Sequence, residues 1–283
     1  MSAVCALLAS LVWGTSDFVG GILARRLAVT ALVLCSQALG LVALVVILSG
    51  ADLWAGDARS IIWGAVAGVV GIAALAAFYR GLAVGPMGIV SPVASVGVLV
   101  PFAGGLVVGE RPQAVQLVGA AFAIVGVMVA ARPEEPDAVG RGHLRPVLLG
   151  LASAAGFGVV LLAVQRGSEG SVAMTLVSMR AAGVALLGAV TLARLPTGRR
   201  VVGWPRVADV PGVVVVGTFD LAANALFALA GRGHLLSVAA VLSSLYPAVT
   251  ALLAWGLLKE RLGRVQAAGV AGAVAGVLML AAG

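Results

Sequence analysis

The chain has 283 residues, of which 61% are hydrophobic and 10% are charged, and its mean hydropathy is +1.15. A soluble domain carries about 25% charged residues, so this chain cannot cover a surface that faces water. We therefore expect a polytopic membrane protein. The net charge of +7 would suggest nucleic acid in a soluble protein, but here the basic residues lie mostly in short loops. Membrane orientation explains such residues better, and we expect no nucleic-acid partner.

Apolar runs and their breaks predict ten transmembrane spans of about 20 residues each, which use up the length of the chain. The spans must be helices, because lipid offers no partner to unpaired backbone groups. No basic region precedes the first apolar run, so we expect that run to be retained as a helix rather than cleaved as a signal peptide. The predicted spans are 3–23, 29–49, 61–80, 87–108, 113–131, 146–165, 172–193, 210–230, 236–258 and 265–282.

Two stretches of the chain, 110–131 and 260–281, match each other in a gapless register. Each begins with charged residues between two apolar segments, which indicates a short polar turn between two helices. Chance similarity between segments rich in Ala, Val and Gly is the alternative, but a shared acid-base pair and a shared Gln favour duplication. The matched positions are Glu110/Glu260, Arg111/Arg261, Val115/Val265, Gln116/Gln266, Gly119/Gly269, Gly126/Gly276 and Val127/Val277.

Each copy contains five predicted spans, an odd number, so the second copy enters the membrane from the opposite side. We therefore expect an all-α integral membrane fold of ten transmembrane helices in two inverted five-helix repeats. The first repeat is predicted at 1–131, a linker loop at 132–145 and the second repeat at 146–283. Secondary transporters are commonly built this way, since two similar halves can expose one site alternately to each side.

The repeated Glu-Arg turn with its Gln and spaced Gly, and the sequence Trp13-Gly14-Thr15-Ser16, resemble the EamA-type repeats of the drug/metabolite transporter superfamily. Arg180 stands where such repeats often carry an Arg, whereas its counterpart in the first copy is Gln37. The resemblance implies a ten-helix transporter of small metabolites. We expect an exporter in the plasma membrane, as a monomer or homodimer. The resemblance also implies a central cavity lined by spans 3–23, 61–80, 87–108, 146–165, 210–230 and 236–258.

Orientation in the membrane follows two rules that disagree. Loops after odd-numbered spans hold most of the basic residues, so the positive-inside rule places both termini outside. The resemblance places both termini in the cytoplasm. Both lines of reasoning predict that the termini share one side.

Three charged residues lie inside the predicted spans, away from their ends, namely Asp17, Arg180 and Asp220. Each costs about 2.5–3.5 kcal/mol on insertion scales, so such groups face a cavity or pair together. Arg180 and Asp220 lie at similar depths, at about 1.5 Å of rise per residue, and we predict that they form an ion pair. The pair serves either as a structural link or as part of a substrate site.

If Arg180 is satisfied by Asp220, then Asp17 is left as an unpaired carboxyl in the membrane region. Such a group can bind and release a proton, which proton-coupled transport requires. Thr15 and Ser16 beside it would hydrogen-bond a substrate, so protonation and binding would compete for one site. The alternatives are that Asp17 is hydrated near the interface or pairs with Arg180 itself.

Other polar side chains could line the same cavity, although a single Ser or Thr usually bonds its own backbone. Prolines interrupt spans 87–108 and 236–258, and bends in corresponding helices point to a transporter's binding site; a simple packing kink is the alternative. The polar candidates are Thr15, Ser16, Gln37, Ser91, Ser95, Asn224, Ser243, Ser244, Tyr246 and Thr250, and the bends are predicted at Pro92, Pro101 and Pro247.

Two further features have structural interpretations. Glycines that share a face, at Gly64, Gly68 and Gly71 and again at Gly269, Gly272 and Gly276, indicate close helix packing rather than a cofactor site. Glu110 and Glu260 stand near the start of a helix, where a carboxylate is electrostatically favoured, so we interpret them as turn determinants.

Enzyme chemistry finds no support in the sequence. There is no HExxH, GxSxG or GxxxxGK[ST] motif, and no predicted span contains a His. Cys5, Cys35, His143 and His234 form no cluster suited to metal binding or catalysis. We expect no enzymatic activity, cofactor or metal. A lipid flippase or a channel remains as the alternative to a carrier, and a channel would not show counterflow or saturable exchange.

Overall fold

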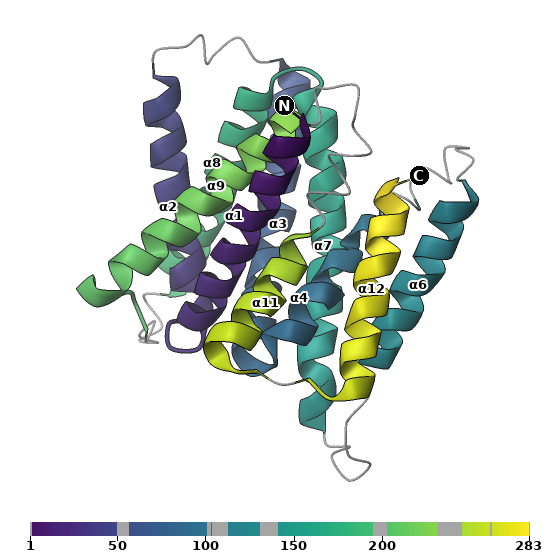
Figure 1. Cartoon of the computed structure of the whole chain (residues 1–283). Coiled ribbons are helices and arrows are strands. Elements are labelled where there is room, and N and C mark those ends of the chain that lie inside the picture. Colours follow the sequence, from purple (N-terminus) through teal and green to yellow (C-terminus); the bar gives the residue numbers. More distant parts are fainter. Residues whose placement is uncertain are drawn as a thin grey trace.

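The structure is a computed structural model that describes residues 2–49, 57–100, 103, 113–130, 141–194, 203–230, 245–260 and 262–282. Within these ranges the regular secondary structure is entirely helical (Figure 1). Six of the helices in the described part are long and apolar enough to cross a membrane. They include Val4–Ala24, Val29–Leu48, Ala58–Val84, Leu144–Ser168, Val172–Ala193 and Val207–Phe227.

Each predicted span overlaps a helix in the described residues. Spans 87–108 and 236–258 are longer than the helices found there, and residues 101–102, 104–112 and 231–244 lie outside the described part. The helices are α1 (Ser2–Ala24), α2 (Val29–Leu48), α3 (Ala58–Val84), α4 (Met87–Ser95), η1 (Val96–Val98), α6 (Ala114–Ala130), α7 (Arg141–Ser168), α8 (Val172–Arg194), η4 (Val207–Asp209), α9 (Val210–Ala230), α11 (Tyr246–Leu258) and α12 (Arg264–Ala282).

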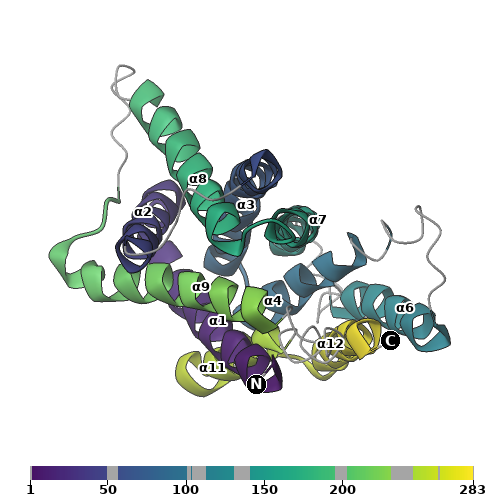
Figure 2. The ribbon, with the colours of Figure 1, turned by 90° about the horizontal axis from the view of Figure 1, so that it is seen from above.

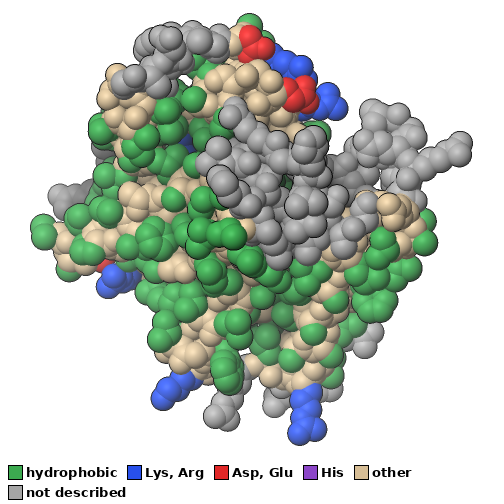
Figure 3. Space-filling view, turned by 45° about the horizontal axis from the view of Figure 1, so that its top comes forward, with side chains coloured by type: hydrophobic (Ala, Val, Ile, Leu, Met, Phe, Trp, Pro, Cys, Tyr) green, Lys and Arg blue, Asp and Glu red, His purple; other side chains and the backbone are tan. Residues whose placement is uncertain are grey.

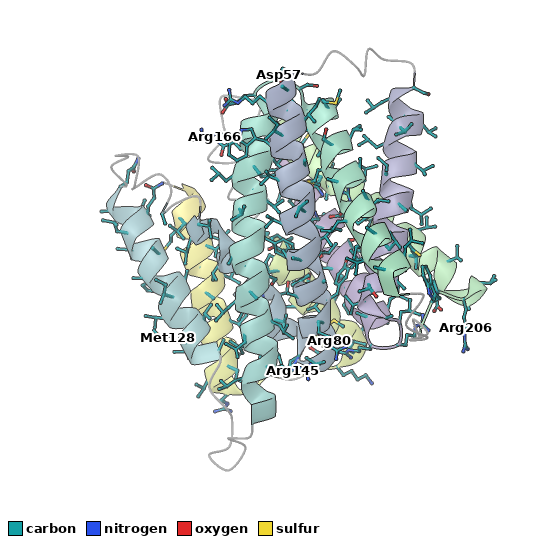
Figure 4. The ribbon with its side chains drawn as sticks, turned by 180° about the vertical axis from the view of Figure 1, so that it is seen from behind. Asp57, Arg80, Met128, Arg145, Arg166 and Arg206 are labelled. Atoms are coloured by element: carbon teal, nitrogen blue, oxygen red, sulfur yellow. The ribbon has the colours of Figure 1, made fainter. Side chains whose placement is uncertain are left out.

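Apolar side chains cover the flanks of the bundle, and charges gather at its two ends. Figure 3 shows the hydrophobic flank with basic groups at the lower end and both signs of charge at the upper end. Ile47 and Trp255 are 72% and 67% exposed, as expected of residues that face lipid. Asp57 and Arg166 lie at one end, which we call the Asp57 end, and Arg80, Arg145 and Arg206 lie at the other, the Arg80 end (Figure 4). This distribution fits a bilayer around the flanks.

The two ends of the chain lie toward the same side of the bundle. The start of α1 and the end of α12 both lie in the upper half of Figure 1, which corresponds to the Asp57 end. The prediction that the termini share a side agrees with this arrangement.

Helices α6 and α12 pack side by side as an antiparallel pair at one edge of the bundle (Figure 2). A Cβ added to Gly119 would lie 2.8 Å from the carbonyl oxygen of Gly276, and one added to Gly126 would lie 2.7 Å from that of Gly269. Cβ atoms at Gly276 and Gly269 would meet the same two partners in return. The contacts therefore exchange when each glycine is replaced by its repeat counterpart. Such a pattern is that of a two-fold axis between antiparallel helices, and the predicted packing role of these glycines is confirmed.

The Gln shared by the two repeats has the same role in each. The backbone N–H of Gln113 donates to Gln116 Oε1 at 2.9 Å, and the N–H of Gly263 donates to Gln266 Oε1 at 3.4 Å. In both helices the side chain reaches back from the third helical position to the residue before the first turn. This is half of a capping box, and it satisfies a backbone donor that the helix leaves free.

The helices of each repeat pack mainly against those of the other repeat. Helix α3 packs along α7 and α8, while α9 packs along α1 and α2. Two glycines allow the close approach of α3 to α8, because a Cβ at Gly64 would lie 2.5 Å from the Thr175 carbonyl oxygen and one at Gly68 would overlap the Met179 carbonyl. The core of the protein is therefore built between the repeats rather than within each one.

At the Asp57 end, the start of α3 holds the connection between α7 and α8. Asp57 caps α3 by accepting the Ser60 N–H at 2.9 Å. Ser60 Oγ lies 2.6 Å from Asp57 Oδ1 and 2.9 Å from the Gly167 carbonyl oxygen, and it accepts the Ser171 N–H at 2.9 Å. One buried serine thus joins the two repeats at this end.

At the Arg80 end, the segment before α9 holds the connection between α1 and α2. Asp209 accepts the Arg206 N–H at 3.0 Å and pairs with Arg26 at 2.9 Å. The Ala28 N–H donates to the Gly203 carbonyl at 3.0 Å. Gly203 has φ +97°, and a Cβ there would lie 2.7 Å from the Ala28 nitrogen, so glycine is needed for both reasons. The two ends are therefore fastened by equivalent pairs of segments.

Glu260 makes long-range contacts at the Arg80 end. Its Oε1 lies 2.8 Å from Arg25 Nη2, and its Oε2 accepts the Gly88 N–H in the first turn of α4 at 3.3 Å. Lys259 ends α11 in a left-handed conformation, with φ 54°, and so turns the chain toward these partners. Glu260 thus fixes a turn, as predicted, and it also joins that turn to α1 and α4.

Candidate functional site

Arg180 and Asp220 form the predicted ion pair between α8 and α9. Arg180 Nη1 lies 2.6 Å from Asp220 Oδ2, and the Arg180 side chain is fully buried. Arg180 Nη1 also donates to Gln37 Oε1, and Gln37 Nε2 donates to Asp220 Oδ2 at 3.4 Å. Gln37 is the counterpart of Arg180 in the first repeat, so the two equivalent positions meet. Because one repeat carries Arg and the other Gln at this position, Asp220 is contacted by one cation and one neutral amide.

The second oxygen of Asp220 is also engaged. Asp220 Oδ1 accepts the Trp13 indole N–H at 3.2 Å and an Asn224 side-chain N–H at 3.2 Å. Donors from α1, α2, α8 and α9 therefore converge on one carboxylate. With every acceptor position in use, Asp220 is a junction of four helices rather than an open binding group.

Asp17 is different, because no hydrogen bond or ion pair to it is found among the described residues. Its side chain is 8% exposed, on the face of α1 that carries Trp13 one turn earlier. Asp220, Tyr79 and Tyr246 lie close enough to interact with it electrostatically. The prediction that Arg180 takes Asp220 and leaves Asp17 available agrees with this geometry.

Asp17 and Asp220 both line a cavity of about 150 Å³ in the middle of the bundle. Side chains from α1, α2, α3, α7, α8, α9 and α11 contribute to its wall. Gly68 and Gly71 leave room on the α3 side. Apart from a few polar groups the wall is apolar and aromatic, as is usual in a site for a small organic molecule.

A packed hydrophobic cluster closes the cavity toward the Arg80 end. The cavity-lining residues of α3 end at Leu75, and the buried Phe78, Tyr79 and Leu82 follow in the direction of Arg80. Phe18 on α1 and Met87 on α4 complete this cluster. A molecule in the cavity can reach the Arg80 end only if these side chains separate.

Five of the predicted polar residues lie on the cavity wall, and Arg180 lies behind Asp220. Four others are not on this wall, and the hydroxyls of three of them bond backbone carbonyls. Thr15 donates to the Leu11 carbonyl, Ser16 to Val216 and Ser95 to Pro92, while Ser91 is buried with no partner among the described residues. Thr250, at 3.1 Å from the Gly14 carbonyl oxygen, is also off the wall. Those on the wall are Asp17, Gln37, Asp220, Asn224 and Tyr246. Ser243 and Ser244 lie outside the described residues.

The expected set of lining helices also needs correction. Within the described residues α4 contributes nothing to the wall, because it is enclosed by α7, α11 and α12, whereas α2 and α8 do contribute. Pro92 lies inside α4, which passes into a 3₁₀ turn directly afterward, as expected of a bend. Pro247 lies in the first turn of α11, and residues 231–244 before it lie outside the described part, so the bend expected there stays a prediction. Pro101 lies outside the described residues.

Sequence reasoning missed the aromatic part of the wall. Trp13, Phe157 and Phe227 line the cavity, and the Trp13 ring lies 5.7 Å from Phe227 and 6.0 Å from Tyr246 between centroids. The spacing of these rings from the carboxylates along each helix could have revealed them. Trp13 precedes Asp17 by four residues, and Phe227 follows Asp220 by seven, so each ring shares a helix face with a carboxylate.

Comparisons with known proteins agree with this architecture. The family model of the EamA-like transporter family matches residues 1–132 and 144–282. One solved protein, described only as a crystal structure of a protein, has a TM-score of 0.64 at 18% identity, covering 98% of this chain and 95% of that chain. At this identity the likeness shows the fold alone. No curated protein matches the chain. Since the family match covers nearly all of both repeats, this membrane protein belongs to the EamA-like transporter family.

Proposed function

We propose that the protein is a secondary active transporter that exports a small organic molecule across the plasma membrane. The observation that carries the proposal is the central cavity, built between the two repeats and containing Asp17. In this proposal all ten helices cross the bilayer, in two inverted halves at 1–131 and 146–283 joined by the loop 132–145. The reciprocal glycine contacts of α6 and α12 and the equivalent fastenings at the two ends support the inverted arrangement.

Alternating access follows from this arrangement. The hydrophobic cluster around Phe78 and Tyr79 closes the Arg80 end, and release there requires these side chains to separate. Because the repeats are alike, each can adopt the conformation of the other, which moves the barrier from one end to the other. The substrate site stays at the cavity throughout.

Reconstituted vesicles test the transport proposal. Vesicles loaded with a mixture of metabolites and placed in labelled members of the same mixture should show saturable exchange and counterflow of at least one of them. Flux without counterflow would indicate a channel, and movement of labelled lipid between leaflets would indicate a flippase. Failure to exchange any member of a broad panel would contradict the proposal.

Asp17 is the proposed site of proton coupling. A carboxyl in the membrane region that takes up a proton on one side and loses it on the other links substrate movement to the pH gradient. Asp17→Asn should abolish accumulation driven by an imposed pH gradient and preserve exchange of substrate for substrate when the substrate is at a saturating concentration. Thr15→Val is the matched control, since Thr15 is on the same helix and bonds its own backbone at 2.7 Å. Unchanged pH-driven uptake in folded Asp17→Asn would remove Asp17 from the mechanism.

A further inference from the structure

We propose that the cavity binds a small lipophilic organic cation, with the positive charge held between the Asp17 carboxylate and the faces of Trp13 and Tyr246. The inference rests on the proposed transport function and adds the chemical class of the substrate. It follows from the charges of the cavity, from its rings and from the position of Arg180.

The charges on the cavity wall do not balance. The described wall contains two carboxylates, Asp17 and Asp220, and no cationic side chain. Arg180 neutralises Asp220 from behind at 2.6 Å, and no partner for Asp17 is found in the described part of the chain. One negative charge is therefore left over when Asp17 is ionised. A charge at this depth is costly unless it is paired, so the cavity favours a ligand that brings a positive charge.

The rings near Asp17 are arranged to hold such a ligand. Trp13, Phe227 and Tyr246 come from three different helices and cluster with centroid distances of 5.7 and 6.0 Å from Trp13. The bond from the Trp13 indole N–H to Asp220 fixes the orientation of its ring. Aromatic faces attract organic cations by cation–π interactions, most strongly when water is excluded. The same rings, with Leu75 and Leu161, provide apolar surface for the rest of the molecule.

An anionic ligand finds no equivalent partner in this cavity. Arg180 is the one cation that the structure places near the cavity among the described residues, and its Nη1 is held by Asp220 and Gln37. Its Nε and Nη2 have no hydrogen-bond partner there, but Arg180 is fully buried and is not on the wall. A carboxylate or phosphate entering the cavity would meet Asp17 first. The charge arrangement therefore selects against anions.

A set of three probes of similar shape tests the inference on the purified full-length protein in detergent. Phenyltrimethylammonium carries a permanent positive charge, tert-butylbenzene is its neutral counterpart, and benzenesulfonate carries a permanent negative charge. Binding is measured by titration calorimetry for the ions and by competition for the neutral probe. We expect the cation to bind about tenfold or more tightly than the neutral probe, and the sulfonate not to bind.

Variants then locate the charge. Asp17→Asn should weaken binding of phenyltrimethylammonium about tenfold or more and leave the neutral probe unchanged, while Asp17→Glu should restore much of the affinity. Trp13→Leu should weaken binding of the cation more than binding of the neutral probe. Asp57→Asn is the control, an acid-to-amide change at the membrane boundary outside the cavity, and it should leave the affinities for the cation and the neutral probe unchanged. Unfolding midpoints establish that each variant is folded.

Two outcomes would overturn the inference. Equal affinity for the cation and its neutral counterpart would show that the charge is not recognised, and preference for benzenesulfonate would show an anion site at Arg180. Because these measurements need no flux, they separate this inference from the transport proposal. Exchange of some other solute by vesicles, without cation binding, would defeat the substrate class alone.

Discussion

The indole N–H of Trp13 and the carboxylate of Asp220 are joined by a hydrogen bond of 3.2 Å between α1 and α9. Asp220 is at the same time the counter-ion of Arg180, so one carboxylate both neutralises a buried cation and orients a ring of the cavity. The charge pair and the binding surface are therefore coupled. A change at Asp220 must affect the stability of the fold as well as the shape of the site.

Asp220→Asn should be strongly destabilising. It leaves the fully buried Arg180 without its counter-charge, and breaking a buried pair in this way costs about 3–5 kcal/mol. The free energy of unfolding in detergent, from denaturant titration, measures the loss. Asp17→Asn is the matched control and should cost much less, since no partner for Asp17 is found among the residues described. The double variant Arg180→Met with Asp220→Leu should recover most of the stability, and no recovery would contradict the desolvation argument.

Gly126→Ala should destabilise the α6–α12 pair. The added Cβ would overlap the Ala273 backbone nitrogen, and backbone cannot yield as a flexible side chain does, so we expect a loss of about 1–3 kcal/mol. Gly256→Ala in α11 is the control, because a Cβ there meets nothing within 4 Å. That variant should be neutral or slightly stabilising, as alanine is the better helix former. Thermal unfolding distinguishes the two, and equal midpoints would be inconsistent with close packing at the crossing.

Stability should fall in acid through Asp57, which lies at the membrane boundary. Hydrogen bonds from the Ser60 side chain and backbone hold the pKa of the Asp57 carboxyl below its ordinary value of about 3.9. A lowered folded-state pKa contributes stability that is complete above the unfolded value and is lost as the pH falls through the folded one. The difference in unfolding midpoint between the natural protein and Asp57→Asn should therefore stay constant above about pH 5 and shrink below about pH 4.

Ser60→Ala provides the control for this pH dependence, since it removes the side-chain donor, the larger cause of the lowered pKa, and keeps the backbone donor. In the Ser60→Ala background the Asp57→Asn change should produce a smaller acid-dependent difference. A difference as large as in the natural protein would show that the Ser60 hydroxyl is not what lowers the pKa of Asp57.

Glu260 should stabilise the Arg80 end through two separable contacts. Glu260→Gln keeps an acceptor for the Gly88 N–H but loses the partly exposed pair with Arg25, at a cost of about 0.2–1 kcal/mol. Glu260→Ala also loses the cap on α4 and should cost about 1–2 kcal/mol. Denaturant unfolding measures both. Glu169→Gln, in an exposed pair at the other end, is the control and should have almost no effect. A larger loss for Gln than for Ala would contradict the capping role.

The features of the fold that could be predicted are those that the bilayer requires, namely the helical spans and the pairing of buried charges. A bilayer requires long apolar helices, and α1, α2 and α8 agree closely with the predicted spans. Helix α3 continues to Val84, beyond the predicted end at residue 80. Arg80 is exposed at the end of the bundle, so its charge does not have to end the helix. The Arg180–Asp220 pair could be predicted from depth, since charges at similar heights in a low-dielectric interior find each other.

The site was less predictable, because composition does not reveal rotation about a helix axis. Ser91 and Ser95 lie on a helix that is enclosed on several sides, and nothing in their spacing distinguishes a cavity-facing hydroxyl from one directed into the core. The hydroxyls of Thr15 and Ser95 bond carbonyls of their own helices, a common fate of such groups in membranes. Trp13 and Phe227 indicate the position of the site better, because each shares a helix face with a carboxylate that lines the cavity.

A single carboxylate without a partner in the described cavity has an electrical consequence. If one organic cation and one proton occupy Asp17 in turn, each cycle carries one positive charge in each direction, and no net charge crosses the bilayer. A membrane potential does work of about 2.3 kcal/mol per net charge per 100 mV, and here there is none on which it can act. The exchange would then run on the pH difference alone and continue at full rate in a depolarised cell.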